Sequence, residues 1–318
     1  MKTPRNRPPR IRRGAALLAA AALLSPVPLA AADLVRGVRM KLSAADLASG
    51  EAAVEEYRRE HGTDREALDA LGWLARGAVM LGRPERAAAY AAEVRRGIPA
   101  ETPDLVVPLG AAIEVESKLK LAAEGRGAAL RFLETELGRA RDTALRSRIR
   151  KNIDLLSLEG EIAPALGGAD PAGVPAPRLA ELAGRPVLLF FWASGCGDCK
   201  AEAAKLGRLR EKYGAKGLAV IAPTRLYGTA EGDRPAPPAE ETAHVARVFA
   251  ESFPGLAGVP VPVDTETMVR WGVSATPTYA LVDAAGTVRL YAPTRLSEAE
   301  LSRRIEELIP TSASRSRP

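Results

Sequence analysis

The chain has 318 residues, of which 47% are hydrophobic, so it is long and apolar enough to build two domains with separate cores. The formal net charge is +6, but six of the 45 basic residues lie within residues 1–32, which contain no acidic residue. The rest of the chain therefore carries equal numbers of basic and acidic residues. Because nucleic-acid binding requires a basic surface, we expect no nucleic-acid partner.

Residues 1–32 have the composition of a secretory signal peptide. A basic segment up to Arg13 precedes the apolar run Ala15–Leu24, and Ala30-Ala31-Ala32 supplies a small-residue cleavage site before Asp33. The apolar run is shorter than the about 20 residues of a spanning helix, which favours a cleaved signal over an uncleaved membrane anchor. We therefore expect the mature chain to be periplasmic or otherwise exported, in a compartment where disulfides persist.

Residues 33–160 are predicted to be helical throughout, because they are rich in Ala, Leu, Glu and Arg and lack alternating β-branched runs. We expect three helical hairpins in this domain. Two interpretations stay open: a concave surface that docks a protein partner, and a packed helical cap that supports a second domain. One stretch resembles a tetratricopeptide repeat in the spacing of Leu74, Ala75, Ala78, Gly82, Ala87 and Pro99.

Residues 161–178 are rich in Pro and Gly and predict a linker that leads into the second domain. The unbroken apolar run Pro186–Trp192 then predicts a strand buried on both faces, as in the middle of a sheet. A short polar turn follows, and Lys200–Tyr213 is predicted to be a helix. The two cysteines of the chain, Cys196 and Cys199, lie at this strand-to-helix junction.

The position of the cysteine pair favours thiol chemistry. The first turn of a helix has free N–H groups and the positive end of the helix dipole, and both lower the pKa of a thiol. Cys196 comes first and is expected to be the attacking sulfur, while Cys199 is expected to resolve the mixed disulfide. A stabilising disulfide would close too small a loop to gain much stability, and half of a zinc site would lack further cysteines.

The elements predicted after the cysteines continue to residue 310, where the second domain, residues 179–310, ends. A long insertion, Pro223–Gly258, carries His244, and Thr276-Pro277 comes directly before another apolar strand. The remaining predicted elements are strand Gly217–Ala222, helix Glu240–Phe253, strand Val259–Val263, helix Thr265–Trp271, the hairpin of Tyr279–Asp283 with Val288–Tyr291, helix Ser297–Leu308, and a disordered tail, residues 311–318.

Two motifs of the second domain resemble the thioredoxin superfamily, and within it the exported TlpA/ResA-like thiol–disulfide oxidoreductases. They are Phe191-Trp-Ala-Ser194 with Cys196-Gly-Asp-Cys-Lys200, and Ala275-Thr-Pro-Thr278 far downstream; Glu202 matches as well. The resemblance implies an α/β thioredoxin-like domain, with a central mixed sheet flanked by helices, preceded here by the all-α helical-hairpin domain. It also implies a redox-active cysteine pair that works without a cofactor or a metal.

The resemblance assigns a substrate-binding rim to Trp192, Gly195, Thr276 and Pro277. It implies a cis peptide bond before Pro277, which turns the backbone of Thr276 toward an extended substrate segment. Gly195 stands where the family usually has a second Trp, so we expect an open rim.

Two further roles follow from positions close to the cysteines. Gly197 and Asp198 lie between them and are expected to tune the redox potential, with Asp198 in place of the usual Pro. Phe190 occupies the position of the buried Asp of thioredoxins proper, which leaves Glu202 as the candidate to accept the proton of Cys199.

These features predict a reductase of disulfides in exported proteins. Asp198 adds negative charge beside the sulfurs, which favours the disulfide form and makes the dithiol the better reductant. The expected partners are a protein disulfide substrate and a membrane or exported electron donor, with a protein partner of the helical domain under the docking interpretation.

Two functions of other classes stay open. The chain could be a helical docking or scaffold protein whose redox domain is secondary. It could also be a copper-delivery protein, since Sco-type copper chaperones combine a cysteine pair with a distant His such as His244. Those proteins space their cysteines by three residues, whereas Cys196 and Cys199 are separated by two, and a surface histidine is the simpler interpretation.

Overall fold

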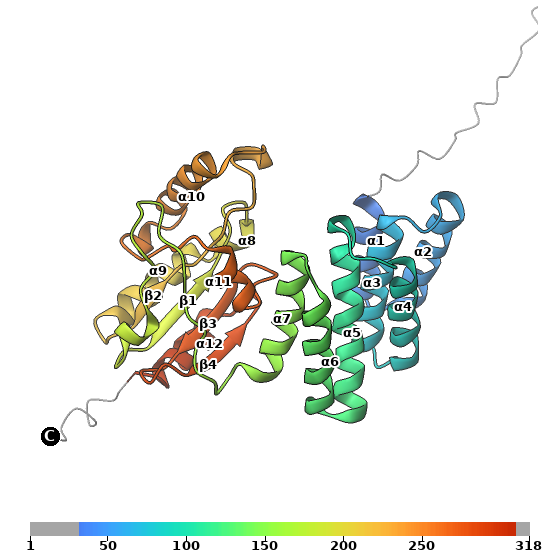
Figure 1. Ribbon diagram of the computed structural model, residues 1–318, viewed down its shortest axis with the longest axis horizontal. Coiled ribbons are helices and arrows are strands. Elements are labelled where there is room, and N and C mark those ends of the chain that lie inside the picture. The colour runs from blue at the N-terminus through green and yellow to red at the C-terminus, as the bar shows by residue number, and fades with distance from the viewer. Residues whose placement is uncertain (1–31, 310–318) are drawn as a thin grey trace, which may run out of the picture.

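The N-terminal half of the chain is helical in the computed structural model, which describes residues 32–309. The predicted tail, residues 311–318, lies outside the described residues, and so does the predicted signal peptide except for its last residue, Ala32. Within residues 32–309 no helix is both long and apolar enough to cross a membrane. The helices of this half are α1 (Ala32–Ser43), α2 (Leu47–His61), α3 (Arg65–Met80), α4 (Pro84–Gly97), α5 (Val106–Glu124), α6 (Arg126–Arg139) and α7 (Thr143–Ser157) (Figure 1).

Consecutive helices pack in pairs, α1 on α2, α3 on α4 and α5 on α6, and α7 packs on the last pair. Asp46 caps α2 by accepting a hydrogen bond from the Ser49 N–H at 3.0 Å, and Gly82 closes the α3–α4 turn with a φ of +66°. Small residues on facing helices let the helix axes approach closely. At the α3–α4 pair, the small residues Ala75, Ala78, Ala87 and Ala91 are fully buried. The pairing of consecutive helices confirms the expected helical hairpins.

The C-terminal half is built on a four-stranded mixed sheet in the order β2-β1-β3-β4. β1 is parallel to β2 and antiparallel to β3, with Phe191 opposite Thr278. All five residues of β1 are buried, as expected of a central strand. The strands are β1 (Val187–Phe191), β2 (Ala219–Ile221), β3 (Thr278–Val282) and β4 (Val288–Ala292).

Alternate residues of β1 are buried on opposite faces of the sheet. Leu188 and Phe190 join a core that includes residues of α9 (Ala203–Gly214), α10 (Pro238–Ser252) and α12 (Glu298–Glu306). Phe191 joins the core on the other face, with Met268 of α11 (Thr265–Arg270) and Trp271. The expected fold class, a mixed sheet flanked by helices behind an all-helical region, is confirmed.

Two predicted elements differ from the structure. Val259–Val263 is irregular, because Pro260 and Pro262 have no N–H; their carbonyls accept hydrogen bonds from the Ala222 and Thr224 N–H groups, each at 2.9 Å. The helix predicted over Lys200–Tyr213 begins earlier and is interrupted: α8 (Gly197–Ala201) and α9 meet at Glu202. Short 3-10 helices complete the list, namely η1 (Pro103–Leu105), η2 (Leu179–Leu182), η3 (Glu231–Asp233) and η4 (Pro254–Leu256).

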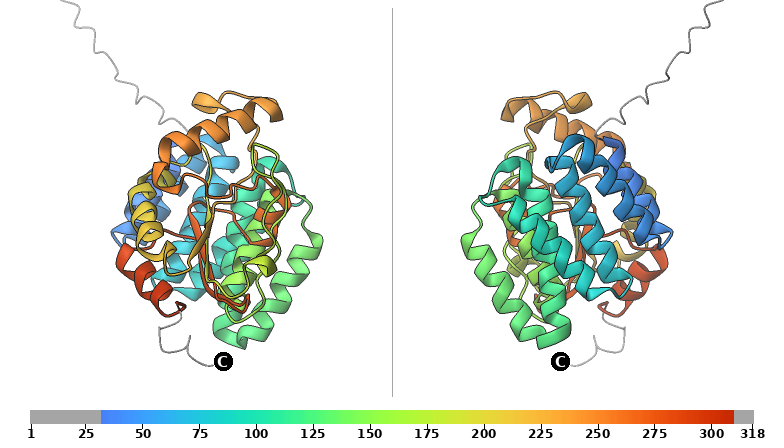
Figure 2. Two further views of the ribbon diagram at one scale, coloured as in Figure 1. Left: turned by 90° about the vertical axis from the view of Figure 1, so that its left-hand side faces the viewer. Right: turned by 90° about the vertical axis from the view of Figure 1, so that its right-hand side faces the viewer.

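The helical region and the sheet region meet where α7 packs against α11. They follow one another along the long axis of the molecule (Figure 1), and each covers the other in the end-on views of Figure 2. Gly272 has a φ of +57° and lies very close to α7. A Cβ at this position would be 2.5 Å from the backbone nitrogen of Lys151, so only glycine fits. The helical region therefore lies directly beside Gly272, five residues before Pro277.

The stability of the protein should depend on pH because α7 carries a buried carboxylate. Asp154 of α7 is 5% exposed, and one of its carboxylate oxygens has no hydrogen-bond partner among the described residues. Burial raises the pKa of Asp154 from its ordinary value of 3.8 to about 7, against the opposing attraction of Arg150. Between these two values the folded chain holds a proton that the unfolded chain has lost. The free energy of unfolding therefore falls as the pH rises, by up to about 1.4 kcal/mol per unit from this group.

The Asp154→Asn variant has no carboxylate at this position, so this fall in the free energy of unfolding with rising pH should be absent from it. We expect the stability difference between the variant and the wild type, measured by denaturant unfolding at several values between pH 4 and pH 8, to grow in favour of the variant as the pH rises. A difference that stays constant over this range would contradict the raised pKa of Asp154.

Candidate active site

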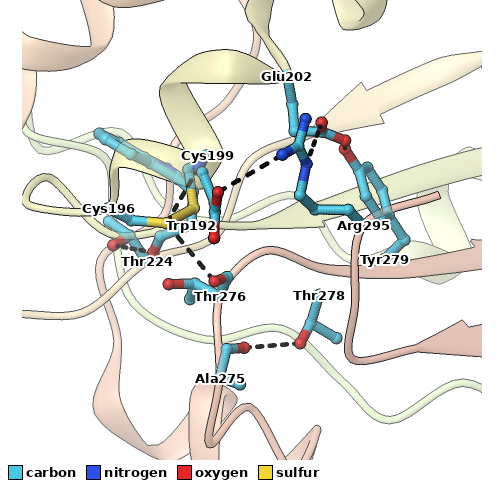
Figure 3. The surroundings of a disulfide bond; sticks show 11 residues. Trp192, Cys196, Cys199, Glu202, Thr224, Ala275, Thr276, Thr278, Tyr279 and Arg295 are labelled. Carbon is cyan, nitrogen blue, oxygen red and sulfur yellow. Dashed lines mark hydrogen bonds and ion pairs between the residues drawn. A yellow bond between two sulfur atoms is a disulfide. The ribbon is translucent and has the colours of Figure 1, made fainter. Parts of the chain in front are cut away.

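The two cysteines lie at the end of the central strand, where β1 gives way to α8. They are joined by a disulfide, with their Cα atoms 5.2 Å apart (Figure 3). Cys196 is the N-cap of α8, and the backbone N–H of Cys199 points at its sulfur at 3.0 Å. A backbone N–H in this position stabilises negative charge on the sulfur that it points at.

The two sulfurs differ in access. Cys199 is fully buried, in the core shared with Trp192 and Leu206, whereas Cys196 is only half-buried. A substrate disulfide can therefore reach Cys196 but not Cys199. The assignment of Cys196 as the attacking residue and Cys199 as the resolving one stays a prediction, which this difference in access favours.

The Thr276–Pro277 segment lies against the cysteine pair although it is far away in the sequence. The Thr276–Pro277 peptide bond is cis, and the carbonyl oxygen of Thr276 lies 3.5 Å from the Cys196 sulfur (Figure 3). The turn is held by the Thr278 hydroxyl, which donates to the Ala275 carbonyl at 2.8 Å. Thr276 is half-buried, so its backbone lies at the rim of the site, next to the accessible sulfur.

The expectation that Trp192 contacts substrate is wrong for its side chain. Trp192 is fully buried, and its indole N–H donates to the Ala222 carbonyl at 3.0 Å. Its ring packs against Phe249 and Phe253 of the α10 side, at centroid distances of 5.2 and 5.4 Å. The alternation along β1 could have indicated this, because Trp192 lies two residues after Phe190 and so faces the same core.

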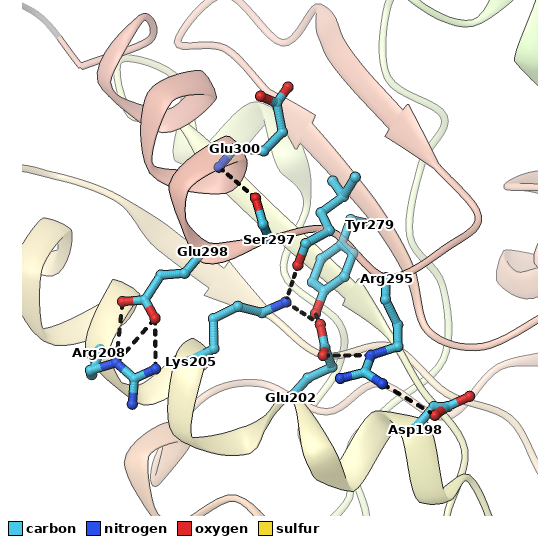
Figure 4. A network of polar contacts seen from close by, with 10 residues as sticks. Asp198, Glu202, Lys205, Arg208, Tyr279, Arg295, Ser297, Glu298 and Glu300 are labelled. Carbon is cyan, nitrogen blue, oxygen red and sulfur yellow. Dashed lines mark hydrogen bonds and ion pairs between the residues drawn. The ribbon is translucent and has the colours of Figure 1, made fainter.

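Glu202 is placed differently from the expected proton acceptor. It is 2% exposed, and its carboxylate accepts hydrogen bonds from the Tyr279 hydroxyl at 2.6 Å, from Arg295 Nε at 3.0 Å and from Lys205 Nζ (Figure 4). Burial raises the pKa of Glu202, but these hydrogen bonds and the charge of Lys205 outweigh it, so that the pKa lies below its ordinary value.

A carboxylate with a lowered pKa is a weak base near neutral pH. The contacts of Glu202 therefore favour a structural and electrostatic role over proton transfer. Lys205, Tyr279 and Arg295 were not identified from the sequence. Only Lys205, three residues from Glu202 on the following helix, carries a local pattern that could have indicated it.

Asp198 and the two glycines of the active-site turn are exposed. Asp198 is not a lone charge, because Arg295 Nη1 lies 3.5 Å from its Oδ1. Gly195 and Gly197 are both exposed, and no side chain at either position covers Cys196.

His244 lies nearer to the site than its sequence position suggests. It lines, together with Ser194, Gly195 and Lys200, a polar pocket of about 350 Å³ between the active-site turn and α10. Arg247 Nη2 lies 3.1 Å from His244 Nδ1, and because an arginine can only donate, this nitrogen is the acceptor in the contact. A cation beside the imidazole disfavours copper, and in residues 32–309 no three or more His, Cys, Asp or Glu residues are grouped to hold a metal ion.

Comparison with known proteins finds one family whose model is similar to the sheet region. The sequence profile of the Redoxin family matches residues 176–298, which include both cysteines and the cis-proline. The region has a thioredoxin-like fold and is similar in sequence to the Redoxin family. Helices α1 to α7 precede the matched residues. No curated protein matches the chain.

Several solved structures are similar to the thioredoxin-like domain. A Chlorobium tepidum protein named as a thiol:disulfide interchange protein DsbE is 27% identical, with 48% of this chain and 98% of that chain covered and a TM-score of 0.39. A secreted Mycobacterium tuberculosis disulfide oxidoreductase is 19% identical over 45% and 96% of the chains, with a TM-score of 0.36. The exposed lipoprotein thioredoxin Etrx1 of Streptococcus pneumoniae is 21% identical over 46% and 100%, with a TM-score of 0.37.

Proposed function

We propose that the chain is a thiol–disulfide oxidoreductase that reduces disulfides of exported proteins through Cys196 and Cys199. One observation carries the proposal. A half-buried cysteine at a helix N-cap is bonded to a fully buried one and lies 3.5 Å from the backbone oxygen that precedes a cis-proline. The Redoxin match over residues 176–298 supports the same activity.

The reaction consists of two thiol–disulfide exchanges. The Cys196 thiolate, stabilised by the Cys199 N–H, attacks one sulfur of the substrate disulfide; a mixed disulfide forms and the other substrate sulfur leaves as a thiolate. Cys199 then loses its proton and attacks Cys196, which releases the second substrate thiol and closes the Cys196–Cys199 disulfide. Two electrons pass to the substrate, and an external dithiol must restore the reduced pair.

The backbone at Thr276 is the proposed docking strand for the substrate. Its carbonyl lies next to the Cys196 sulfur, at the rim of the site, where an extended segment of the substrate can pair with it. Exposed Gly195 completes the proposed rim, and Pro277, which is buried, is proposed to shape the rim through its cis bond to Thr276. Gly197 and Asp198 are proposed to set the redox potential.

Export of the mature chain, and supply of electrons by a membrane or exported donor, belong to the same proposal. Its basis is the signal-like sequence of residues 1–32 and the use of the two cysteines as a redox pair. We place the boundary between the helical domain and the linker at about residue 160, and assign to the helical domain the binding of a protein partner.

The test is an assay of disulfide reduction in a protein substrate, with dithiothreitol as the electron source. Catalytic amounts of the full mature chain should accelerate reduction of the substrate. With the Cys196→Ser, Cys199→Ser double variant, the rate should equal that of the uncatalysed reaction. A scaffold function predicts the opposite pattern, since the double variant would keep the biological role and the wild type would show no turnover.

A further inference from the structure

Arg295 connects the active-site turn to the buried carboxylate beneath it. It lies in the loop between β4 and α12, 93 residues after Glu202. Its Nε is 3.0 Å from Glu202 Oε1 and its Nη1 is 3.5 Å from Asp198 Oδ1, so that one guanidinium bridges two carboxylates (Figure 4). Asp198 is the residue directly before Cys199, so the bridge ends inside the Cys-Gly-Asp-Cys turn.

The buried end of the bridge fixes the position of the guanidinium. Tyr279 and Lys205 bond to Oε2 of Glu202, which leaves Oε1 for Arg295. Lys205 also donates to the backbone carbonyl of Leu296, next to Arg295, and so holds the loop. An ion pair between two exposed side chains is usually mobile and weak. Here the arginine is anchored on a buried carboxylate, which keeps its outer nitrogen directed at Asp198.

The charge of Asp198 acts on the sulfurs in the opposite sense to the charge of Arg295. A carboxylate beside a thiol opposes the formation of a thiolate, and a nearby cation reduces this effect. Arg295 is the basic residue that the structure pairs with Asp198. The prediction that the charge of Asp198 makes the dithiol the better reductant therefore omits a compensating charge.

We infer that Arg295 is a positioning residue that tunes the redox pair by compensating the charge of Asp198. The inference rests on the proposed function. With Arg295 in place, the Cys196 thiolate is easier to form and the reduced form is more stable. Without it, Asp198 acts uncompensated, the thiol pKa rises, and the equilibrium moves toward the disulfide.

The test uses Arg295→Gln in the full mature chain, with two readouts. The first is the alkylation of Cys196 by iodoacetamide in the reduced protein, measured as a function of pH. The midpoint of this pH dependence should move to higher pH in the variant. The second is the equilibrium with dithiothreitol, which should shift about threefold to tenfold toward the disulfide, or about 14 to 30 mV to more negative potential.

A double-mutant cycle separates compensation of Asp198 from a loss of structure. Asp198→Asn alone should shift both readouts in the opposite direction, and in its background the effect of Arg295→Gln should fall to less than half. Arg289→Gln is the matched control: Arg289 is 51% exposed against 53% for Arg295, and it pairs with Asp283 at the far end of β3 and β4. This control should leave both readouts unchanged.

Unchanged readouts in Arg295→Gln, or an equal shift with and without Asp198, would overturn the inference. Arg295→Lys keeps the positive charge, so the pKa of its Cys196 thiol should stay close to the wild-type value. This variant tests the inference if Arg295→Gln does not fold. Failure of the wild type to cycle between dithiol and disulfide would instead overturn the proposed function, whatever Arg295 does.

Discussion

The Cys199→Ser variant should accumulate a stable mixed disulfide with its substrate, and its turnover should fall to the uncatalysed rate. Cys196 remains half-buried and able to attack, but the sulfur that releases the substrate is missing. Non-reducing electrophoresis with mass spectrometry of the trapped species measures the complex directly.

Cys196→Ser is the matched control for this experiment. It removes the accessible sulfur and should give neither turnover nor a complex. If Cys196→Ser trapped the substrate while Cys199→Ser did not, the assignment of the attacking and resolving sulfurs would be reversed.

Glu202→Gln should lower the free energy of unfolding by about 3 kcal/mol, because it removes the charged partner of a buried lysine and weakens the bonds to Tyr279 and Arg295. Since the pKa of Glu202 lies below its ordinary value of 4.5, its stabilising effect is fully present above that pH. The effect is lost as the pH falls through the folded-state pKa. The difference between the variant and the wild type should therefore shrink in acid.

The same variant distinguishes the two roles considered for Glu202. Denaturant unfolding of Glu202→Gln and of the control Glu211→Gln, an exposed residue of α9, measures the structural role; the control should change stability by less than about 0.5 kcal/mol. Unaltered stability together with a loss of turnover of about a hundredfold would show that Glu202 transfers a proton after all.

The sequence predicted the parts of the site that depend on local patterns. The unbroken apolar run predicted β1, and a helix was expected to follow the cysteines, although α8 begins at Gly197 and not at Lys200. The helix predicted over Ser297–Leu308 is α12, and the Ser297 hydroxyl caps it by accepting from the Glu300 N–H at 3.1 Å. The cis bond at Pro277 was expected through the resemblance of the Thr-Pro motif and is present. Each of these features is decided by a few neighbouring residues.

The parts that were missed depend on residues brought together by the fold. Tyr279 and Arg295 meet Glu202 across 77 and 93 residues, and no local pattern joins them. The contact of Gly272 with α7 likewise depends on how two separate regions pack. Trp192 was misassigned because a motif was carried over without applying the strand alternation, which places its ring in the core.

A redox titration of the mature chain tests the central claim most directly. The protein is equilibrated in dithiothreitol buffers of defined potential, and the fraction of alkylated Cys196 and Cys199 is measured by mass spectrometry. A reversible two-electron transition with a midpoint at or below about −270 mV, the value of thioredoxin, is the predicted result for a disulfide reductase. A midpoint near about −120 mV would contradict that direction and make the chain an oxidant that inserts disulfides.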